Sequence, residues 1–241
     1  MADLNYKAED SVYKVKEIGG YMELELPRKK SYYYGADVVE VNTGRAAIYH
    51  AIKASKAKKL YLPHYLCTSM LQVIEHLNLE FEFYNIDENF MPIFDRQTTE
   101  DEAFLYINYF GTASKNTIKK LKNCHKNFLM DNTQAFFAKP IKGAYNLYSA
   151  RKFFGVNDGG YLIKDGIQKI DLESDLSYPH AIHLLKRIEE GANAAYLDNM
   201  KNEDRFDDFN PIGMSKLSKR ILESVDYEEV KLKRQRNFYY L

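Results

Sequence analysis

The residue types with the clearest chemical potential lie between positions 127 and 165. Two short apolar runs there, NFLM and GGYLI, are typical of strands, and Asp131 directly follows the first. Gln134 comes next, and Lys152 lies in a Ser-Ala-Arg-Lys turn before the second run. A lysine amine forms a Schiff base with an aldehyde, and a carboxylate keeps a pyridine nitrogen protonated so that the ring acts as an electron sink. These residues therefore predict a pyridoxal phosphate site.

Each of these residues also has a simpler interpretation. By itself, Asp131 is more typical of a cap on the element that follows than of a cofactor contact. Gln134 could lie against a flat ring or bind a neighbouring loop. Lys152, beside Phe153 and Phe154, is expected to be partly desolvated, which lowers the pKa of its amine and makes it a usable nucleophile. A surface lysine next to aromatic residues is a common alternative.

A turn suited to phosphate lies earlier, at Thr43-Gly44-Arg45, between a predicted strand and a predicted helix. The free N–H groups of a helix's first turn attract anions, and glycine lets the anion approach closely. Alone this signal is weak, because any turn from strand to helix can carry a glycine. Neither GxGxxG nor GxxxxGK[ST] occurs, so dinucleotide and nucleoside triphosphate sites lose their main support.

A metal site is the competing interpretation. His64 and Cys67 have a spacing that ligands could use, and Cys124-His125 forms a second pair. Zinc normally takes four such ligands in recognisable spacing, and the sequence contains no CxxC or HExxH. We therefore predict no metal site.

Composition excludes several classes of function. The 241 residues are 45% apolar, with 34 Lys plus Arg and 34 Asp plus Glu. This balance gives no general attraction to nucleic acid or to an anionic membrane. No window approaches the roughly 18 apolar residues of a membrane span. Two cysteines far apart in the sequence suit a reducing compartment, so we predict a cytoplasmic protein.

Apolar periodicity predicts the elements that would position these residues. Strands are expected at 37–41, 60–63, 79–86, 103–111 and 127–131, and helices at 45–59, 68–77 and 114–126. This alternation predicts a three-layer α/β/α fold with a mostly parallel central sheet. Residues 21–27 suit an edge strand or an extended arm. Beyond position 165, helices are expected at 179–200, at 214–225 and from 226 onward.

The order of these pieces is more specific than any one of them. The chain resembles the DegT/DnrJ/EryC1/StrS family of pyridoxal-phosphate-dependent sugar aminotransferases, of the aspartate aminotransferase (fold type I) superfamily. The matching segments are NTGRAAIYHAI, YLPHYLCTSM, YINYFG, DNTQAF and YSARKFFGVNDGGYL. The segment PIGMSKLSKRILESVDYEEVKLKRQRN is similar to the helical region that leads to the family's C-terminal domain.

The resemblance implies a role for each matching residue. Lys152 would hold the cofactor and shuttle a proton, and Asp131 would pair with its ring nitrogen. Gln134 would contact the ring face or its hydroxyl. The phosphate would be bound by Gly44, Arg45 and Ser149. In many members an aromatic side chain covers the cofactor near the position of Cys67, so Cys67 and its neighbour Tyr65 are assigned to the cofactor site.

The resemblance also implies partners and a domain organisation. The substrates would be a nucleotide-linked keto-sugar and an amino-acid amino donor, and the protein would act as a homodimer. We expect an N-terminal arm (1–36), a cofactor-binding large domain (37–200) and a helical segment (201–241) that leads to a C-terminal domain missing from this chain. A missing domain favours one alternative, a catalytically impaired binding or assembly subunit. A flavodoxin-like module for another phosphate ligand is the weakest alternative.

Overall fold

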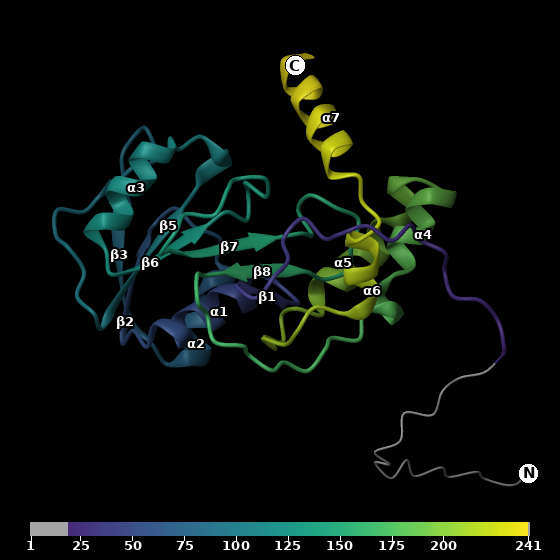
Figure 1. Cartoon of the computed structure of the whole chain (residues 1–241), viewed down its shortest axis with the longest axis horizontal. Coiled ribbons are helices and arrows are strands. Elements are labelled where there is room, and N and C mark those ends of the chain that lie inside the picture. The colour runs from purple at the N-terminus through teal and green to yellow at the C-terminus, as the bar shows by residue number, and fades with distance from the viewer. Residues whose placement is uncertain (1–18, 241) are drawn as a thin grey trace, which may run out of the picture.

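The computed structural model describes residues 19–240, which form an eight-stranded sheet flanked by helices (Figure 1). The strand order is β1-β8-β7-β6-β5-β2-β3-β4. The strands are β1 (Val38–Val41), β2 (Lys59–Pro63), β3 (Glu80–Ile86), β4 (Pro92–Ile93), β5 (Glu102–Ile107), β6 (Asn127–Asp131), β7 (Tyr145–Ser149) and β8 (Gly160–Ile163). The helices are α1 (Gly44–Ser55), α2 (Ser69–Leu77), α3 (Lys115–Cys124), α4 (Ile182–Glu189), α5 (Ala192–Asp204), α6 (Lys216–Leu222) and α7 (Tyr227–Tyr240).

The sheet is mostly parallel, as predicted. Strands β3, β2, β5, β6 and β7 pair in parallel, whereas β8 is antiparallel to both β7 and β1. The carboxyl ends of β1, β6 and β7 therefore meet at one edge, which is where ligands bind in open α/β sheets. The short strand β4 closes the other side against β3. Sequence periodicity did not predict β7, because YNLYS mixes polar and apolar residues.

Alternation along the strands divides the core between the two faces of the sheet. Leu105, Leu129 and Leu147 lie in the cluster that α1 and α2 cover. Phe104 and Phe128 point the other way, toward Ile118 of α3. Both faces of these strands are thus buried, which explains why their sequences read as continuous apolar runs.

Three predicted elements differ from the structure. The strand expected at 103–111 ends at Ile107, and a 3₁₀ turn, Tyr109–Gly111, follows it. The helix expected at 179–200 is divided into α4 and α5 because Gly191 adopts a φ of 87°, outside helical values. Residues 21–27 form no strand, and residues 1–18 of the predicted arm lie outside the described chain.

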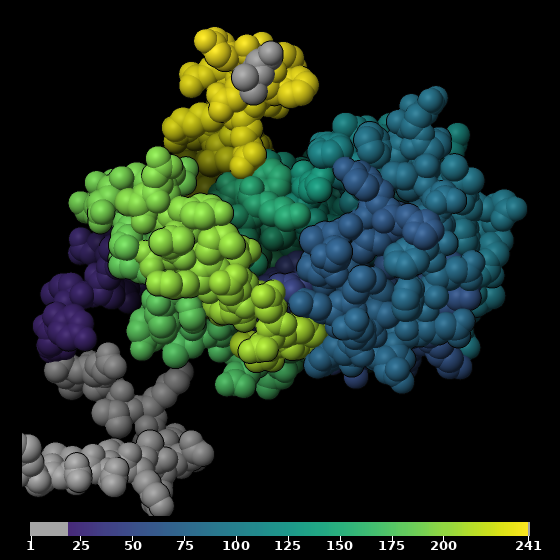
Figure 2. Space-filling view, turned by 180° about the vertical axis from the view of Figure 1, so that it is seen from behind, coloured from purple at the N-terminus to yellow at the C-terminus, as the bar shows by residue number. Residues whose placement is uncertain are grey.

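The C-terminal helices differ in how they are attached. Helix α6 begins at Ser215, whose hydroxyl accepts the N–H of Ser218, and buries Leu222 in the core. Helix α7 extends away from the body of the molecule beyond Tyr227 (Figures 1 and 2). Within residues 19–240, none of these helices has the length and apolarity needed to cross a membrane.

Candidate active site

A cavity of about 260 Å³ opens at the carboxyl edge of the sheet. Its position follows from the register, because Asp131 at the end of β6 pairs with Leu147 and Lys152 lies just past the end of β7. Five of the residues singled out from the sequence line this cavity: Tyr65, Cys67, Asp131, Gln134 and Lys152. The structure thus gathers residues from positions 65 to 152 around one space.

The Asp131 carboxylate is buried yet sparsely hydrogen-bonded. Its side chain is 6% exposed, and the Thr133 N–H donates to Oδ1 at 2.8 Å. Among residues 19–240, only Thr133 donates a hydrogen bond to this carboxylate. Burial raises the pKa of Asp131, while the bonds from Thr133 and the charge of Lys152 act in the opposite direction. A buried carboxylate with free acceptor capacity is suited to a cationic N–H donor.

Lys152 reaches the cavity from a tight turn after β7. The N–H groups of Phe153 and Phe154 both donate to the Ala150 carbonyl at 2.9 Å, which closes the turn. The side chain of Lys152 is exposed, so the prediction that neighbouring aromatic rings desolvate it is wrong. The two phenylalanine rings instead pack toward Phe136, because successive residues of a turn point in different directions.

Gln134 lies in the loop after β6 and Tyr65 in the loop after β2, and both line the cavity. The Gln134 side-chain oxygen accepts the N–H of Phe110 at 3.3 Å, so Gln134 holds the loop that follows β5. The Tyr65 ring stacks on Tyr109 at 5.5 Å with an interplanar angle of 19°. The Tyr109 hydroxyl donates to the Tyr65 carbonyl at 2.6 Å, which ties the two loops together.

Cys67 presents an exposed thiol to the same cavity. The Ser69 hydroxyl donates to its sulfur at 3.1 Å and is the largest cause of a lowered Cys67 pKa. Partial burial opposes this effect, and the positive charges of Lys152 and Arg45 add to it. Among residues 19–240, no three His, Cys, Asp or Glu side chains converge as metal ligands.

The first turn of α1 lies directly against the ends of β6 and β7. A Cβ on Gly44 would sit 3.1 Å from Thr133 Cγ2 and 3.6 Å from Ser149 Cβ. Thr43 caps the helix by accepting the Ala46 N–H at 3.0 Å. A Cβ on Gly160 would be only 2.5 Å from the Thr43 carbonyl, so this junction requires glycine. The turn predicted to hold phosphate therefore lies beside the cavity, although Gly44 and Ser149 do not line it.

Arg45 does not line the Lys152 cavity but a separate depression of about 430 Å³. Its guanidinium donates to Gln72, and the opposite wall carries Glu203 and Asp207. Figure 2 shows a hollow on this side, between the blue segment that contains α2 and the yellow-green segment near position 205. Burial and the charge of Arg151 lower the pKa of Arg45.

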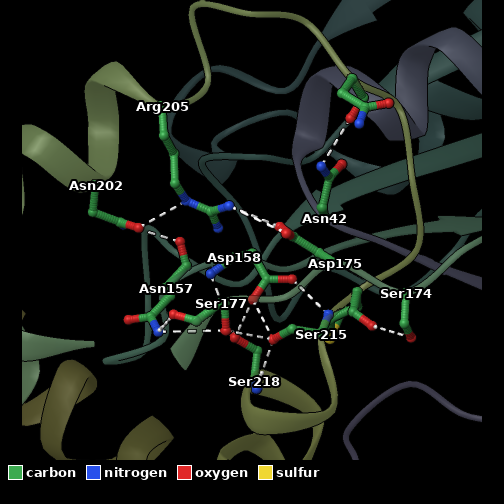
Figure 3. Close-up of polar contacts among 12 residues, drawn as sticks. Asn42, Asn157, Asp158, Ser174, Asp175, Ser177, Asn202, Arg205, Ser215 and Ser218 are labelled. Atoms are coloured by element: carbon green, nitrogen blue, oxygen red, sulfur yellow. Dashed lines mark hydrogen bonds and ion pairs between the residues drawn. The ribbon is translucent and has the colours of Figure 1, made fainter. Parts of the chain in front are cut away.

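A buried network that the sequence did not reveal holds the loop between Lys152 and β8 (Figure 3). Asp158 is fully buried and accepts the Ser215 N–H at 2.7 Å, the Ser215 hydroxyl at 2.6 Å and the Ser218 hydroxyl at 2.5 Å. Asp158 was not among the residues that the sequence analysis singled out. The pattern Ser-x-x-Ser before the apolar residues of α6 was the available signal, because it is typical of a helix N-terminus.

The same network extends to α5. The Asn157 amide donates to the Ser177 carbonyl at 2.8 Å, and the Asn202 amide donates to the Asn157 carbonyl at 3.0 Å. Arg205 continues it, donating to Asn202 at 3.0 Å and pairing with Asp175 at 3.0 Å (Figure 3). Side chains therefore anchor the loop that follows Lys152 to the helical part of the chain, and backbone bonds of Gly159 with Asn42 and Ala150 tie it to the ends of β1 and β7.

Comparisons with known proteins bear on the fold. No family model matches the chain, and no curated protein matches it either. A PLP-bound structure from Clostridium difficile 630, named as an aminotransferase, is 14% identical, with a TM-score of 0.51 over 85% of this chain and 55% of that one. The histidinol-phosphate aminotransferase of Clostridium acetobutylicum is 15% identical, with a TM-score of 0.51 over 85% and 60%.

These likenesses establish that the chain has the fold of these aminotransferases. It spans between 55% and 60% of the length of the two structures. A sugar aminotransferase from Micromonospora echinospora is also similar at 14% identity, over 70% of this chain and 57% of that one. The TM-score of this pair is 0.44.

Proposed function

We propose that this chain is a pyridoxal-phosphate-dependent aminotransferase. The observation that carries the proposal is the convergence of Lys152 and Asp131 on one cavity at the carboxyl edge of the sheet. The fold shared with aminotransferases supports it, because a lysine and an acid at this edge are the groups that pyridoxal phosphate chemistry needs.

The residues fit the cofactor on physical grounds. The buried Asp131 accepts a hydrogen bond only from Thr133 within the described chain, and a protonated ring nitrogen is the cationic donor that would satisfy it. Gly44 and Ser149 lie together at the first turn of α1, whose free N–H groups attract a phosphate. We assign Tyr65, Cys67 and Gln134 to the walls around the ring. We propose that Arg45, in the neighbouring depression, contributes positive charge that attracts the cofactor phosphate.

In this proposal the cofactor supplies an electron sink, and the chain supplies binding and proton transfer. Lys152 would hold the cofactor through its aldehyde, and its amine would serve as the group that moves a proton at the reacting carbon. Asp131 keeps the ring nitrogen protonated. The network around Asp158 fixes the loop that follows Lys152, so the amine returns to the same place in each half-reaction.

The substrates and assembly are parts of the same proposal. We propose a nucleotide-linked keto-sugar as the amino acceptor and an amino acid as the donor, in amino-sugar or surface-polysaccharide biosynthesis. The sequence resemblance supports both substrates and a homodimer. Two free cysteines, Cys67 and Cys124, are compatible with the proposed cytoplasmic location.

An absorption spectrum tests the core of the proposal. After incubation with pyridoxal phosphate, the wild-type protein is expected to show the near-ultraviolet to violet band of lysine-bound cofactor. Lys152→Ala removes the amine and is expected to abolish this band completely. Lys142→Ala is the matched control, because this exposed lysine lies outside the cavity. A wild-type protein without the band would refute the proposal.

A second function is favoured by one observation, the exposure of Lys152. An exposed amine suits a protein that holds the cofactor but turns over poorly. Glutamate separates the two functions. An aminotransferase converts the bound cofactor to its amine form and bleaches the band, whereas a binding or assembly subunit keeps the band unchanged.

A further inference from the structure

Four aromatic rings form a continuous surface at one end of the Lys152 cavity. Tyr65 lies nearly parallel to Tyr109, and it also stacks on Phe90 at 6.5 Å with an interplanar angle of 25°. Phe90 contacts Tyr109 at 5.2 Å and meets the edge of Phe110 at 5.8 Å. Three of these rings, Tyr65, Tyr109 and Phe110, line the same cavity as Lys152. We call this set the aromatic surface.

Folding alone does not account for the aromatic surface. The Phe110 side chain is 61% exposed and that of Tyr65 is 57% exposed, so neither ring is placed there to fill the core. Phe90 and Phe110 both adopt left-handed backbone conformations, with φ values of 61° and 55°. Bulky residues rarely occupy this region, and such strain concentrates at ligand sites.

Specific hydrogen bonds hold the two strained residues. The Gln134 side chain accepts the Phe110 N–H, and the Asp87 carbonyl accepts the Phe90 N–H at 3.0 Å. The Asp87 carboxylate accepts the N–H of Met91 on the far side of the same turn at 2.8 Å. The rings are therefore pre-positioned toward the opening, which reduces the entropy that a ligand must overcome on binding.

The space next to the aromatic surface has a distinct chemistry. A second cavity of about 470 Å³ is lined by Phe90, whose ring contacts Phe110 of the Lys152 cavity. Besides Phe90 it is lined by Asn89, Thr112 and Ser114 and by one carboxylate, Glu88, and its lining contains no lysine or arginine. Hydrogen-bonding side chains beside a flat ring suit a hydroxylated ring with an apolar face, and the lining offers no positive charge to hold a phosphate.

From this arrangement we infer that the aromatic surface is the subsite for the sugar ring of the amino acceptor. The ring stacks on Phe110 and meets the edge of Phe90, with its hydroxyls toward Thr112 and Ser114 and its keto carbon toward Lys152. The diphosphate and the nucleoside lie outside this subsite, because nothing there neutralises them. This inference rests on the proposed aminotransferase function and adds to it the residues that select the acceptor.

Calorimetric binding to the cofactor-loaded protein tests the subsite. The probes are UDP-glucose and dTDP-glucose, with UDP and dTDP as the matched ligands that lack the sugar. Phe110→Ala is expected to weaken the binding of both sugar nucleotides about three- to tenfold, the range that aromatic stacking supports. It should leave UDP and dTDP unchanged. Phe110→Tyr keeps the flat ring and is expected to restore the affinity.

Phe81→Ala is the control, because Phe81 is a partly exposed phenylalanine of β3 that lies outside both cavities. An equal loss of affinity for UDP and UDP-glucose in Phe110→Ala would overturn the inference in favour of a nucleobase site. Unchanged affinities for all four probes would also overturn it. The cofactor band and its bleaching by glutamate are recorded on the same samples, so a failure of the aminotransferase proposal appears there, independently of binding.

Discussion

Two buried aspartates at the same edge of the sheet have very different surroundings. Asp158 is fully buried and accepts hydrogen bonds from Ser215 and Ser218 in a closed network. Asp131 is nearly as buried, at 6% exposure, and accepts a hydrogen bond from Thr133 alone within residues 19–240. Burial raises the pKa of both carboxyl groups.

The difference separates a structural group from the group to which we assign a function. Burying a carboxylate is costly unless hydrogen bonds compensate for lost hydration. Asp158 receives that compensation from the protein itself, so its contribution is complete in the folded chain. Asp131 keeps acceptor capacity beside Lys152, and in the proposed function the ring nitrogen of the cofactor fills it.

The largest expected effect comes from replacing Asp131. Asp131→Asn removes the charge that holds a ring nitrogen protonated, so we expect the rate of transamination to fall at least about a hundredfold. Because the uncompensated charge is also removed, the cofactor-free protein should gain stability, on the order of 1 kcal/mol. Transamination kinetics and thermal melting without cofactor measure the two effects.

Of the two aspartates, only Asp131 should combine a loss of activity with a gain of stability when it is replaced. A variant that lost activity and also melted at a lower temperature would place Asp131 in the same class as Asp158. A variant that kept full activity would remove Asp131 from the site altogether.

The next largest effect is expected at Asp158. Asp158→Ala leaves the Ser215 N–H and the Ser218 hydroxyl without their acceptor and removes one bond of the Ser215 hydroxyl, so the free energy of unfolding should fall by about 3 kcal/mol. Urea denaturation of the cofactor-free protein measures this change. The control is Asp208→Ala, because Asp208 is exposed and should change stability by less than about 0.5 kcal/mol.

If Asp158→Ala proved as stable as the wild type, the network would not be the anchor of the Lys152 loop. A stable variant that lost only its cofactor band would indicate that Asp158 acts on the cofactor site directly.

The smallest expected effect is the pH dependence of stability, which arises from a third buried group, His125. This ring stacks on Phe104 at 3.8 Å with an interplanar angle of 2°, and burial lowers its pKa from 6.5 to about 4. The unfolded chain therefore takes up a proton below pH 6.5 while the folded chain does not. Stability should decrease as the pH falls from about 6.5 toward 4, by about 1–2 kcal/mol at pH 5.

The raised pKa values of Asp131 and Asp158 act in the opposite direction, because protonation of these groups in the folded chain favours folding as the pH falls. His125→Phe should remove the acid-induced loss and leave the opposite trend visible in urea denaturation between pH 7 and 4.5. His64→Phe is the control, since His64 is exposed. If His125→Phe retained the loss, the destabilising proton would bind elsewhere.

Much of the fold was predictable from local patterns. Buried strands such as LYLP and NFLMD appear in the sequence as apolar runs, and the lysines of α3 indicate which face of that helix is exposed. Both patterns are local, because each residue's own polarity reflects whether its side chain is buried. Strand β7 and the break at Gly191 were missed. The sequence of β7 mixes polar and apolar residues, and β7 is a strand because it pairs with β6 and β8. The break at Gly191 depends on a backbone angle that glycine permits but does not require.

By itself, the sequence determined the identity and order of the candidate groups: the acid, the glutamine and the lysine between positions 131 and 152, after a turn suited to phosphate. Only the tertiary structure decided which of them share a space. It directs Arg45 into a neighbouring depression, exposes Lys152, and gathers four aromatic rings from separate loops beside it. The physical reason is that side-chain direction and burial depend on strand register and loop packing, which join residues far apart in the chain.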